Sequence, residues 1–248
     1  MSKKPVVIGI IMTFNCGSML EGMYAKIPKG VLNKLILVDD ASTDNTLEVA
    51  KKLGLKIYTH KHLGYGGNIK YGLKKAVELK ADYMVEIHGD GQYSPQFIPE
   101  GVKKIISGKY DFILGSRFST LSQALKDGMP VERYIANKVL SFMDRLVLQL
   151  PLAEFHSGFR LYSKKFAERT GLRGTANDHL YSFTAIVQAK YCSLKIGGLP
   201  VRCNYRRPHT SISMKESIFY AFQTRGVLLD YLLSRLGVKR KIFKYCTV

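Results

Sequence analysis

The sequence lacks several features that would assign a protein to a class at once. No stretch approaches the ~20 uninterrupted apolar residues that a membrane-spanning helix requires. The four cysteines, Cys16, Cys192, Cys203 and Cys246, show no CxxC spacing and suggest no disulfide framework. Residues 1–5 do not have the architecture of a signal peptide. We therefore expect a protein of a reducing, cytoplasmic compartment.

Linkers, repeats and acidic residues are also scarce. No low-complexity tract and no linker rich in Pro, Gly or Ser divides the 248 residues, which favours one domain. Only 19 Asp and Glu residues oppose 38 Lys and Arg residues, giving a net charge of +19. This excess implies an anionic partner, which is nucleic acid, an acidic membrane surface or a phosphorylated ligand. Charge alone does not choose between these partners.

The first half of the chain alternates between apolar runs and helical patterns. The runs are rich in β-branched residues and too continuous for exposed antiparallel strands, so they predict strands buried on both faces of a parallel sheet. They cover residues 5–12, 35–38, 55–58, 83–87 and 110–114. Helical patterns lie between them, at 43–53, 66–79 and 95–106. Ser42 or Thr43 is a candidate cap for the first helix and Ser94 for the third. The alternation predicts βαβ units with helices on both faces of the sheet.

The second half is less regular. Helices are predicted at 131–150, 179–190 and 213–236, and strands at 158–162 and 194–202. The apolar side chains of the last helix favour packing on the core over contact with a membrane: Ile218, Phe219, Phe222, Leu229, Leu232, Leu233 and Leu236. The segment 239–245 mixes cations with apolar side chains, as segments at a membrane interface do.

Polar residues follow two of the predicted strands. Asp39 and Asp40 end the second strand, and Asp90 and Gln92 follow the fourth. Ligands of open parallel sheets bind at the carboxyl ends of the strands. Carboxylate and amide oxygens beside glycines suit Mg²⁺ or Mn²⁺ held next to a diphosphate. The paired carboxylates are suited to the hydroxyls of a ribose or the imide of a base.

A glycine-rich turn opens the helix after the third strand. Gly64, Gly66 and Asn68 lie where exposed backbone N–H groups favour an anion. A dinucleotide-binding fingerprint would need GxGxxG after the first strand. That strand is instead followed by Thr13, Phe14 and Asn15, so this interpretation is weak.

Taken together, these motifs resemble those of glycosyltransferase family 2, and most closely its polyprenyl-phosphate branch, which includes the dolichol-phosphate mannose synthases. Six motifs occur in family order between Val6 and about Leu236, at residues 13–15, 38–44, 64–68, 88–92, 115–118 and 157–162. The resemblance implies an α/β fold of GT-A type, in which helices flank a Rossmann-like, mostly parallel sheet. It implies one domain at 1–236, with a nucleotide-sugar-binding half at 1–118 and an acceptor-binding half at 119–236. Residues 237–248 would form a basic tail.

The resemblance also implies roles for individual residues on the donor side. Asp39 and Asp40 match the acidic pair that contacts the nucleoside, and the other donor-binding positions are Asn15, Gly64, Gly66 and Asn68. Metal in this family is held by a D-x-D-x-Q pattern, of which Asp90 and Gln92 match the second and third ligands. His88 stands in place of the first Asp. An imidazole there would shift preference toward Mn²⁺ or another transition metal, or would only hydrogen-bond a phosphate.

On the acceptor side, the catalytic base of many family members is missing. Thr184 stands where a Glu is expected, although Asp178 and His179 lie just upstream. A phosphate monoester, with its second pKa near ~6, is ionised at neutral pH and needs no base. Arginines that grip the acceptor phosphate in the resembling enzymes match Arg117, Arg133 and Arg206 or Arg207, and Asn137 matches a further polar contact.

We therefore predict an inverting, metal-dependent glycosyltransferase. It would transfer a sugar from a UDP- or GDP-linked donor to a polyprenyl phosphate, attached peripherally to the anionic inner face of a membrane. One alternative is transfer to a hydroxyl of a glycan, with Asp178 or His179 as base. Another is a nucleotide-sugar-binding protein that has lost catalysis. A nucleic-acid-binding module is suggested by charge alone and lacks a recognisable motif.

Overall fold

The computed structural model of the chain describes residues 4–118, 120–205 and 214–247. The strands are β1 (Val7–Thr13), β2 (Lys34–Asp39), β3 (Lys56–Thr59), β4 (Tyr83–His88), β5 (Phe112–Ser116), β6 (Arg160–Ser163) and β7 (Ile196–Pro200). The α-helices are α1 (Gly17–Tyr24), α2 (Thr46–Lys52), α3 (Tyr65–Glu78), α4 (Ile98–Ile106), α5 (Leu121–Lys126), α6 (Val131–Leu148), α7 (Lys164–Thr170), α8 (Tyr181–Tyr191) and α9 (Met214–Arg235). Two 3₁₀ turns are η1 (Pro95–Phe97) and η2 (Lys241–Phe243).

The strands of the described residues form one seven-stranded sheet in the order β3-β2-β1-β4-β6-β5-β7. All neighbouring pairs are parallel except those of β6, which runs antiparallel to both β4 and β5. The predicted α/β class with a mostly parallel sheet is therefore confirmed. The strand pattern did not predict the direction of β6, because a four-residue segment has too few positions to show whether it is parallel.

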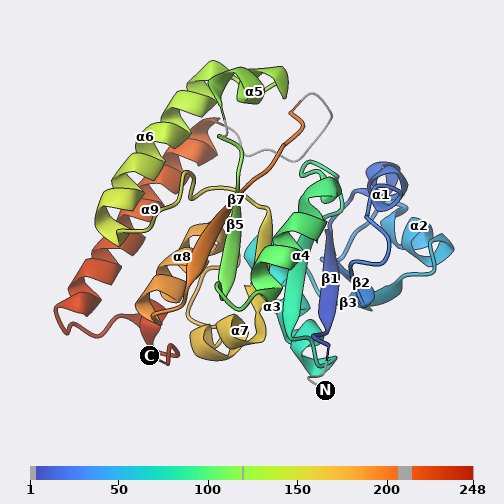
Figure 1. Ribbon diagram of the computed structural model, residues 1–248, viewed down its shortest axis with the longest axis horizontal. Coiled ribbons are helices and arrows are strands. Elements are labelled where there is room, and N and C mark those ends of the chain that lie inside the picture. Colours follow the sequence, from blue (N-terminus) through green and yellow to red (C-terminus); the bar gives the residue numbers. More distant parts are fainter. Residues whose placement is uncertain (1–3, 119, 206–213, 248) are drawn as a thin grey trace.

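Helices cover both faces of the sheet and create two separate cores (Figure 1). One core packs α3, α7, α8 and α9 on one face, and the other packs α1, α2 and α4 on the opposite face. The strand β1 contributes alternately to each, with Ile8 and Ile10 in the first core and Val7 and Ile11 in the second. Each fully buried side chain of this kind contributes ~1.5–3 kcal/mol. The prediction of strands buried on both faces is confirmed for β1, β4 and β5, whereas β3 lies at the edge of the sheet and buries none of its residues.

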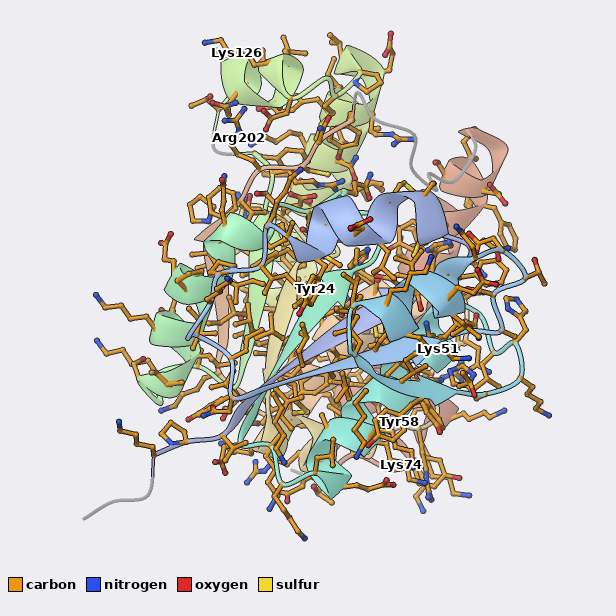
Figure 2. The ribbon with its side chains drawn as sticks, turned by 90° about the vertical axis from the view of Figure 1, so that its right-hand side faces the viewer. Tyr24, Lys51, Tyr58, Lys74, Lys126 and Arg202 are labelled. Atoms are coloured by element: carbon orange, nitrogen blue, oxygen red, sulfur yellow. The ribbon has the colours of Figure 1, made fainter. Side chains whose placement is uncertain are left out.

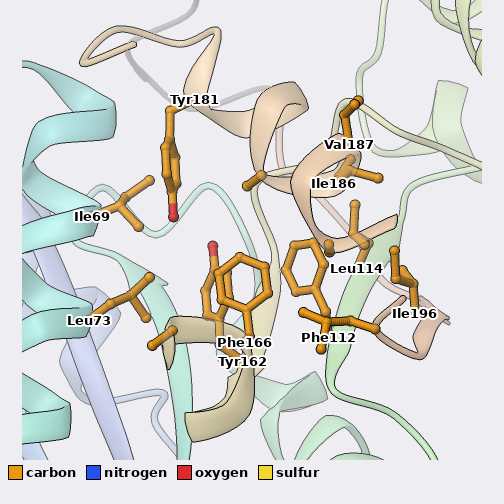
Figure 3. Close-up of a cluster of buried hydrophobic side chains, with 14 of the residues drawn as sticks. Ile69, Leu73, Phe112, Leu114, Tyr162, Phe166, Tyr181, Ile186, Val187 and Ile196 are labelled. Atoms are coloured by element: carbon orange, nitrogen blue, oxygen red, sulfur yellow. The ribbon is translucent and has the colours of Figure 1, made fainter. Parts of the chain in front are cut away.

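The first core also holds polar atoms. Figure 3 shows the hydroxyl groups of Tyr162 on β6 and Tyr181 of α8 facing one another between the aliphatic side chains of α3 and the aromatic ring of Phe166. Tyr162 donates a hydrogen bond of 2.6 Å to Glu86 in β4. A line of buried polar groups therefore runs through this core toward the carboxyl ends of the strands.

The predicted cap of the first helix is wrong, and that of the third is confirmed in position only. The helix α2 begins at Thr46, with Asn45 in the capping position, so neither Ser42 nor Thr43 caps it. Ser42 instead donates to Asp39 and accepts from the N–H of Asn15. Ser94 does precede Pro95, but its side chain makes no capping hydrogen bond.

The apolar stripe of α9 does not pack on the core as predicted. Ile218, Phe219, Phe222, Leu229, Leu232 and Leu236 are exposed, and Phe222 keeps 72% of its surface. The helix touches the core through other residues, including Val227, Leu228 and Tyr231. The helix α6 lies beside α9 (Figure 1) and exposes Val131, Ile135, Val139, Phe142, Met143 and Leu146. We call this exposed set on both helices the apolar face.

The C-terminal segment packs differently from a membrane-interface segment. Phe243 is buried and stacks on Tyr191 of α8, with ring centroids 4.2 Å apart. Gln188 donates to the carbonyl oxygen of Ile242 at 2.6 Å. Ile242 and Phe243 of this segment thus pack on the core, whereas Tyr245 is exposed. Among the helices that the structure describes, none combines the length and apolar character needed to cross a membrane.

Candidate active site

A cavity of ≈ 990 Å³ opens at the carboxyl ends of β1, β2, β4 and β5. Nine of the predicted site residues line it: Asp40, Gly64, Asn68, His88, Asp90, Gln92, Arg117, Arg133 and Asn137. Asn15, Asp39 and Gly66 are not among its lining residues. Arg206 and Arg207 lie outside the described residues. The cavity therefore joins the two groups of residues that the sequence placed on the donor and acceptor sides.

Asp40 is the acidic residue of the pair that faces the cavity. Its two carboxylate oxygens accept hydrogen bonds from the N–H groups of Leu63 and Gly64, at 2.6 and 2.9 Å. The His62 ring nitrogen Nδ1 lies 3.0 Å from the same carboxylate. The ring of His62 is 4.9 Å from that of Phe14, which is also exposed at the cavity wall. This end of the cavity thus combines an oriented carboxylate with two aromatic rings.

Asp39 serves the backbone around the site. It is fully buried and accepts hydrogen bonds from the Thr13 hydroxyl, the Ser42 hydroxyl and the Ser42 N–H. Asn15 works on the same turn, because its side-chain oxygen accepts the N–H of Thr43 at 2.8 Å. Both residues fix the turn that follows β2 and thereby the position of Asp40.

The glycine-rich turn does not present open N–H groups to an anion. Gly66 and Gly67 both donate to the carbonyl oxygen of Asn177, at 2.7 and 3.1 Å. A Cβ atom at Gly66 would lie 2.4 Å from the Cβ of Tyr181, so glycine is required by the close approach of the 176–181 segment. Lys70 reinforces this approach with a bond of 2.7 Å to the Asn177 side chain. The anion-binding expectation for this helix start is corrected accordingly.

His88 is held by its Nε2 atom. That nitrogen lies 3.0 Å from Glu86 Oε1 and 3.1 Å from the carbonyl oxygen of Gly158. Both partners accept hydrogen bonds, so Nε2 carries a proton and is unsuited to bind a metal ion. Burial by itself lowers the pKa of His88, but the hydrogen bond and charge of Glu86 raise it above the usual value overall.

Asp90 and Gln92 sit on the turn that follows β4. One oxygen of Asp90 accepts the N–H of Gln92 at 2.9 Å, which orients the carboxylate at the cavity wall. Within the described part of the chain, no group of three or more His, Cys, Asp or Glu side chains is arranged to hold a metal ion. A magnesium-like ion bound through one or two carboxylates and substrate phosphates does not require such a cage. Asp90 with Gln92 fits that kind of ion.

Glu86 and Arg160 lie side by side on β4 and β6 below the cavity, as directly opposed residues of the antiparallel pair. Arg160 is fully buried, and its two terminal nitrogens have no hydrogen-bond partner among the described residues. Burial pushes the pKa of Glu86 upward, but His88, Arg160 and the Tyr162 hydroxyl together hold it below the usual value. A buried acidic and a buried basic side chain therefore lie on adjacent strands, next to His88 in the cavity wall.

Arg117 lines the cavity, but its N–H groups donate hydrogen bonds to other protein groups. Its backbone N–H and its Nε each donate to Glu154 at 2.6 Å, and a terminal nitrogen also pairs with Glu154. The other terminal nitrogen donates to the Tyr205 hydroxyl. Glu154 is buried at 1% exposure, so the two charges largely neutralise one another inside the wall.

Arg133 and Asn137 lie one turn apart on the same side of α6. The amide of Asn137 donates to the Arg133 carbonyl oxygen at 2.8 Å, and both residues line the cavity.

Asp178 and His179 line the cavity from the loop before α8. Burial lowers the pKa of His179, whose ring stacks on that of Tyr65 at 4.8 Å. Thr184 is buried and donates back to its own helix.

Several site residues were not predicted from the sequence. Glu86 had a signal, because it is the one charged residue within the apolar run 83–87. Glu154, His156 and Tyr220 had none. Glu154 lies 37 residues from its partner Arg117, and His156 and Tyr220 lie 64 residues apart in the sequence. Their roles depend on contacts that only the folded chain makes.

A family model, glycosyl transferase family 2, matches residues 10–171, which is more than half of the chain. Among curated proteins, a UDP-N-acetylglucosamine–dolichyl-phosphate N-acetylglucosaminyltransferase of Methanococcus voltae is 28% identical over 233 residues, covering 85% of this chain and 92% of the relative. A low-salt glycan biosynthesis hexosyltransferase of Haloferax volcanii is 24% identical over 178 residues, covering 71% of this chain and 41% of the relative.

Solved structures share the fold. Glucosyl-3-phosphoglycerate synthase of Mycobacterium tuberculosis, in complex with Mn²⁺, UDP and glucosyl-3-phosphoglycerate, superimposes with a TM-score of 0.69. The match covers 96% of this chain and 82% of that one, at 16% identity.

Proposed function

The chain belongs to glycosyl transferase family 2, and from this premise we propose that it transfers a sugar from a nucleoside diphosphate sugar to a polyprenyl phosphate, with inversion at the anomeric carbon. One observation carries the proposal. A single cavity joins Asp40 and Asp90 to Arg133 and Asn137, and it extends between α6 and α9, where the apolar face begins. The dolichyl-phosphate acceptor named for the Methanococcus relative supports the same acceptor class.

The nucleoside would bind at the end of the cavity that Asp40 occupies. Its carboxylate, oriented by Leu63 and Gly64, accepts hydroxyl or imide donors, while Phe14 and His62 offer rings for the base to stack on. Asp39, Asn15, Gly66 and Asn68 set the turns that shape this end. The donor named for the Methanococcus relative is UDP-linked, and we propose UDP for this chain too.

A divalent cation, Mn²⁺ or Mg²⁺, would be held by Asp90 and Gln92 together with the diphosphate of the donor. When bound, such an ion neutralises charge that develops on the departing diphosphate. His88 would take part only through Nδ1, because Nε2 is engaged by Glu86 and Gly158. Asp90 orients the diphosphate from the turn after β4 and is required in every version of this mechanism.

The acceptor phosphate would enter from the side of α6. Its oxygen forms a bond to the anomeric carbon as the bond to the diphosphate oxygen breaks, and its own ionisation removes the need for a base. Arg133 and Asn137 face this side of the cavity, and Arg206 or Arg207 remain candidates for the same phosphate. Arg117 contributes by fixing the wall with Glu154, and any direct contact with the phosphate requires one of its bonds to be exchanged.

Peripheral attachment to the inner face of a membrane is part of the proposal. The apolar face is continuous with the cavity, because Val139 and Ile218 belong to both. A polyprenyl chain leaving the cavity between α6 and α9 would pass directly along this surface. Cations of the chain would add attraction to anionic lipids.

The central test is the Asp90→Ala variant, assayed with UDP- and GDP-sugars, Mn²⁺ and a polyprenyl phosphate in detergent or vesicles. We expect the wild type to form a lipid-linked sugar and Asp90→Ala to lose at least ~100-fold of that rate, because electrostatic stabilisation of the leaving group is lost. The matched control is Glu48→Ala, an exposed carboxylate at the start of α2. An Asp90→Ala rate equal to the Glu48→Ala rate, with both variants folded, contradicts the site assignment.

A hydroxyl acceptor is the second candidate, and one observation favours it. Burial keeps the pKa of His179 low, so its imidazole is neutral at pH 7 and able to accept a proton. Transfer to a glycan hydroxyl without any lipid phosphate, at a rate that falls as pH drops through the lowered pKa and disappears in His179→Ala, would establish this candidate. Donor binding without transfer to either acceptor would instead identify a protein that has lost catalysis.

A further inference from the structure

A chain of polar side chains joins α6, the segment 154–158 and α9 at the acceptor side of the cavity. Asp144 on α6 is fully buried. Its Oδ2 lies 3.0 Å from His156 Nε2, a close polar contact without the alignment of a hydrogen bond. His156 Nδ1 lies 3.2 Å from the Tyr220 hydroxyl of α9. The transfer mechanism above uses none of these three residues.

Several elements fix the His156 ring in place. Its face stacks on Phe183 of α8, with ring centroids 5.6 Å apart, and Tyr220 meets it edge-on at the same distance. Arg225 of α9 donates to the second oxygen of Asp144. A carboxylate buried to this extent is tolerated only when it is paired. Asp144 is therefore paired with Arg225, and the contacts of Arg225 and His156 hold α9 against α6.

The far end of this chain reaches the cavity. Tyr220 and His156 are lining residues, together with Arg133 and Asn137 on the facing helix. Burial raises the pKa of the Tyr220 phenol well above its usual value, so the group stays protonated at every working pH. Tyr220 is consequently a neutral hydrogen-bonding group with a fixed position rather than a base.

We propose that Tyr220 contacts the acceptor phosphate and that His156 and Asp144 are positioning residues that hold its hydroxyl at the cavity wall. This inference rests on the proposed function, because it takes a phosphate monoester as the acceptor. Arg133 approaches that phosphate from α6, and Tyr220 approaches it from α9. The acceptor is thus held between the two helices that also carry the apolar face.

The test separates acceptor affinity from turnover. In Tyr220→Phe, the KM for polyprenyl phosphate should rise about tenfold, as expected for losing a hydrogen bond to a charged group, while the donor KM stays unchanged. Tyr231→Phe is the matched control, because Tyr231 is an α9 tyrosine packed in the core and away from the cavity lining. We expect its kinetics to equal those of the wild type.

A double-mutant cycle tests the positioning role. His156→Gln should raise the acceptor KM in the wild-type background and change nothing further in the Tyr220→Phe background, since it acts through the tyrosine. Additive effects would overturn the role of His156, and an unchanged acceptor KM in Tyr220→Phe would overturn the whole inference. If His156→Gln does not fold, the Tyr220→Phe and Tyr231→Phe pair decides. Absence of transfer to polyprenyl phosphate by the wild type would refute the proposed function itself, and this inference with it.

Discussion

At the scale of single residues, charges that the core would normally exclude are buried next to His88 in the cavity wall. Glu86 is 3% exposed, and three protein groups hydrogen-bond to it: the Tyr65 hydroxyl, the Tyr162 hydroxyl and the His88 ring. Its cross-strand neighbour Arg160 makes no direct ion pair with a carboxylate among the described residues, and Glu86 is the carboxylate directly opposite it in the sheet. A buried charge without compensation costs several kcal/mol. Glu86 is therefore the residue that makes Arg160 tolerable.

Replacing Glu86 by Gln should destabilise the fold. The neutral amide leaves the Arg160 charge buried without a counter-charge, which typically costs ~3 kcal/mol. Urea unfolding followed by circular dichroism measures this loss as a lower midpoint at unchanged slope. Glu78→Gln is the control, because Glu78 pairs with Lys75 at the exposed end of α3 and should leave the midpoint where it was. Equal midpoints for both variants would contradict the role assigned to Glu86.

The sequence located single site residues better than it located their partners. Asp40 and Asp90 were placed at one edge of the sheet from the strand ends alone, and both line the same cavity. No pattern in the sequence indicated that Arg117 donates to Glu154 or that the Gly66 N–H donates to Asn177. These partners are distant in sequence and lie in segments without periodic pattern, so only the folded chain brings them together.

At the scale of elements, the hydrophobic periodicity of the sequence predicted where the last helix lies along the chain but not which elements pack against it. The last helix was expected at 213–236 and runs from Met214 to Arg235. Its apolar stripe was assigned to the core, yet a stripe shows only which residues share a face and not what covers it. The helices α1, α5 and α7 were missed because each spans eight residues or fewer, too short for a repeating pattern to stand out.

The apolar face of α6 and α9 should govern membrane binding. Phe219→Asp combined with Phe222→Asp removes two rings that are 64% and 72% exposed, and each buried aromatic ring is worth ~1.5–3 kcal/mol. We expect sedimentation with vesicles to fall at least about tenfold while the thermal midpoint is unchanged. Ile106→Asp, an exposed apolar residue on α4 at the opposite face of the sheet, is the control. If the double variant sediments with vesicles as much as Ile106→Asp does, the apolar face does not bind the membrane.

At the scale of the whole molecule, charge and apolar surface act together. The excess of 38 basic over 19 acidic residues is spread over many helices, and Figure 2 shows Lys51, Lys74 and Lys126 on well-separated parts of the surface. Each cation that lies near an anionic leaflet gains ~1 kcal/mol. In the proposed function, the general positive field would bring the protein to the membrane, and the apolar face would then determine which side of the protein meets it.

These two contributions differ in their response to salt. Raising NaCl from about 0.05 M to about 0.5 M shortens the Debye length by roughly threefold, which weakens charge attraction and leaves apolar burial intact. We expect binding to anionic vesicles to fall steeply over this range and to level off at the binding measured on neutral vesicles. The double variant Phe219→Asp with Phe222→Asp should lower the binding that remains at high salt more than it changes the slope of binding against salt concentration. Binding that disappears entirely at high salt would mean that charge alone holds the protein to lipid, and that the apolar face serves another partner.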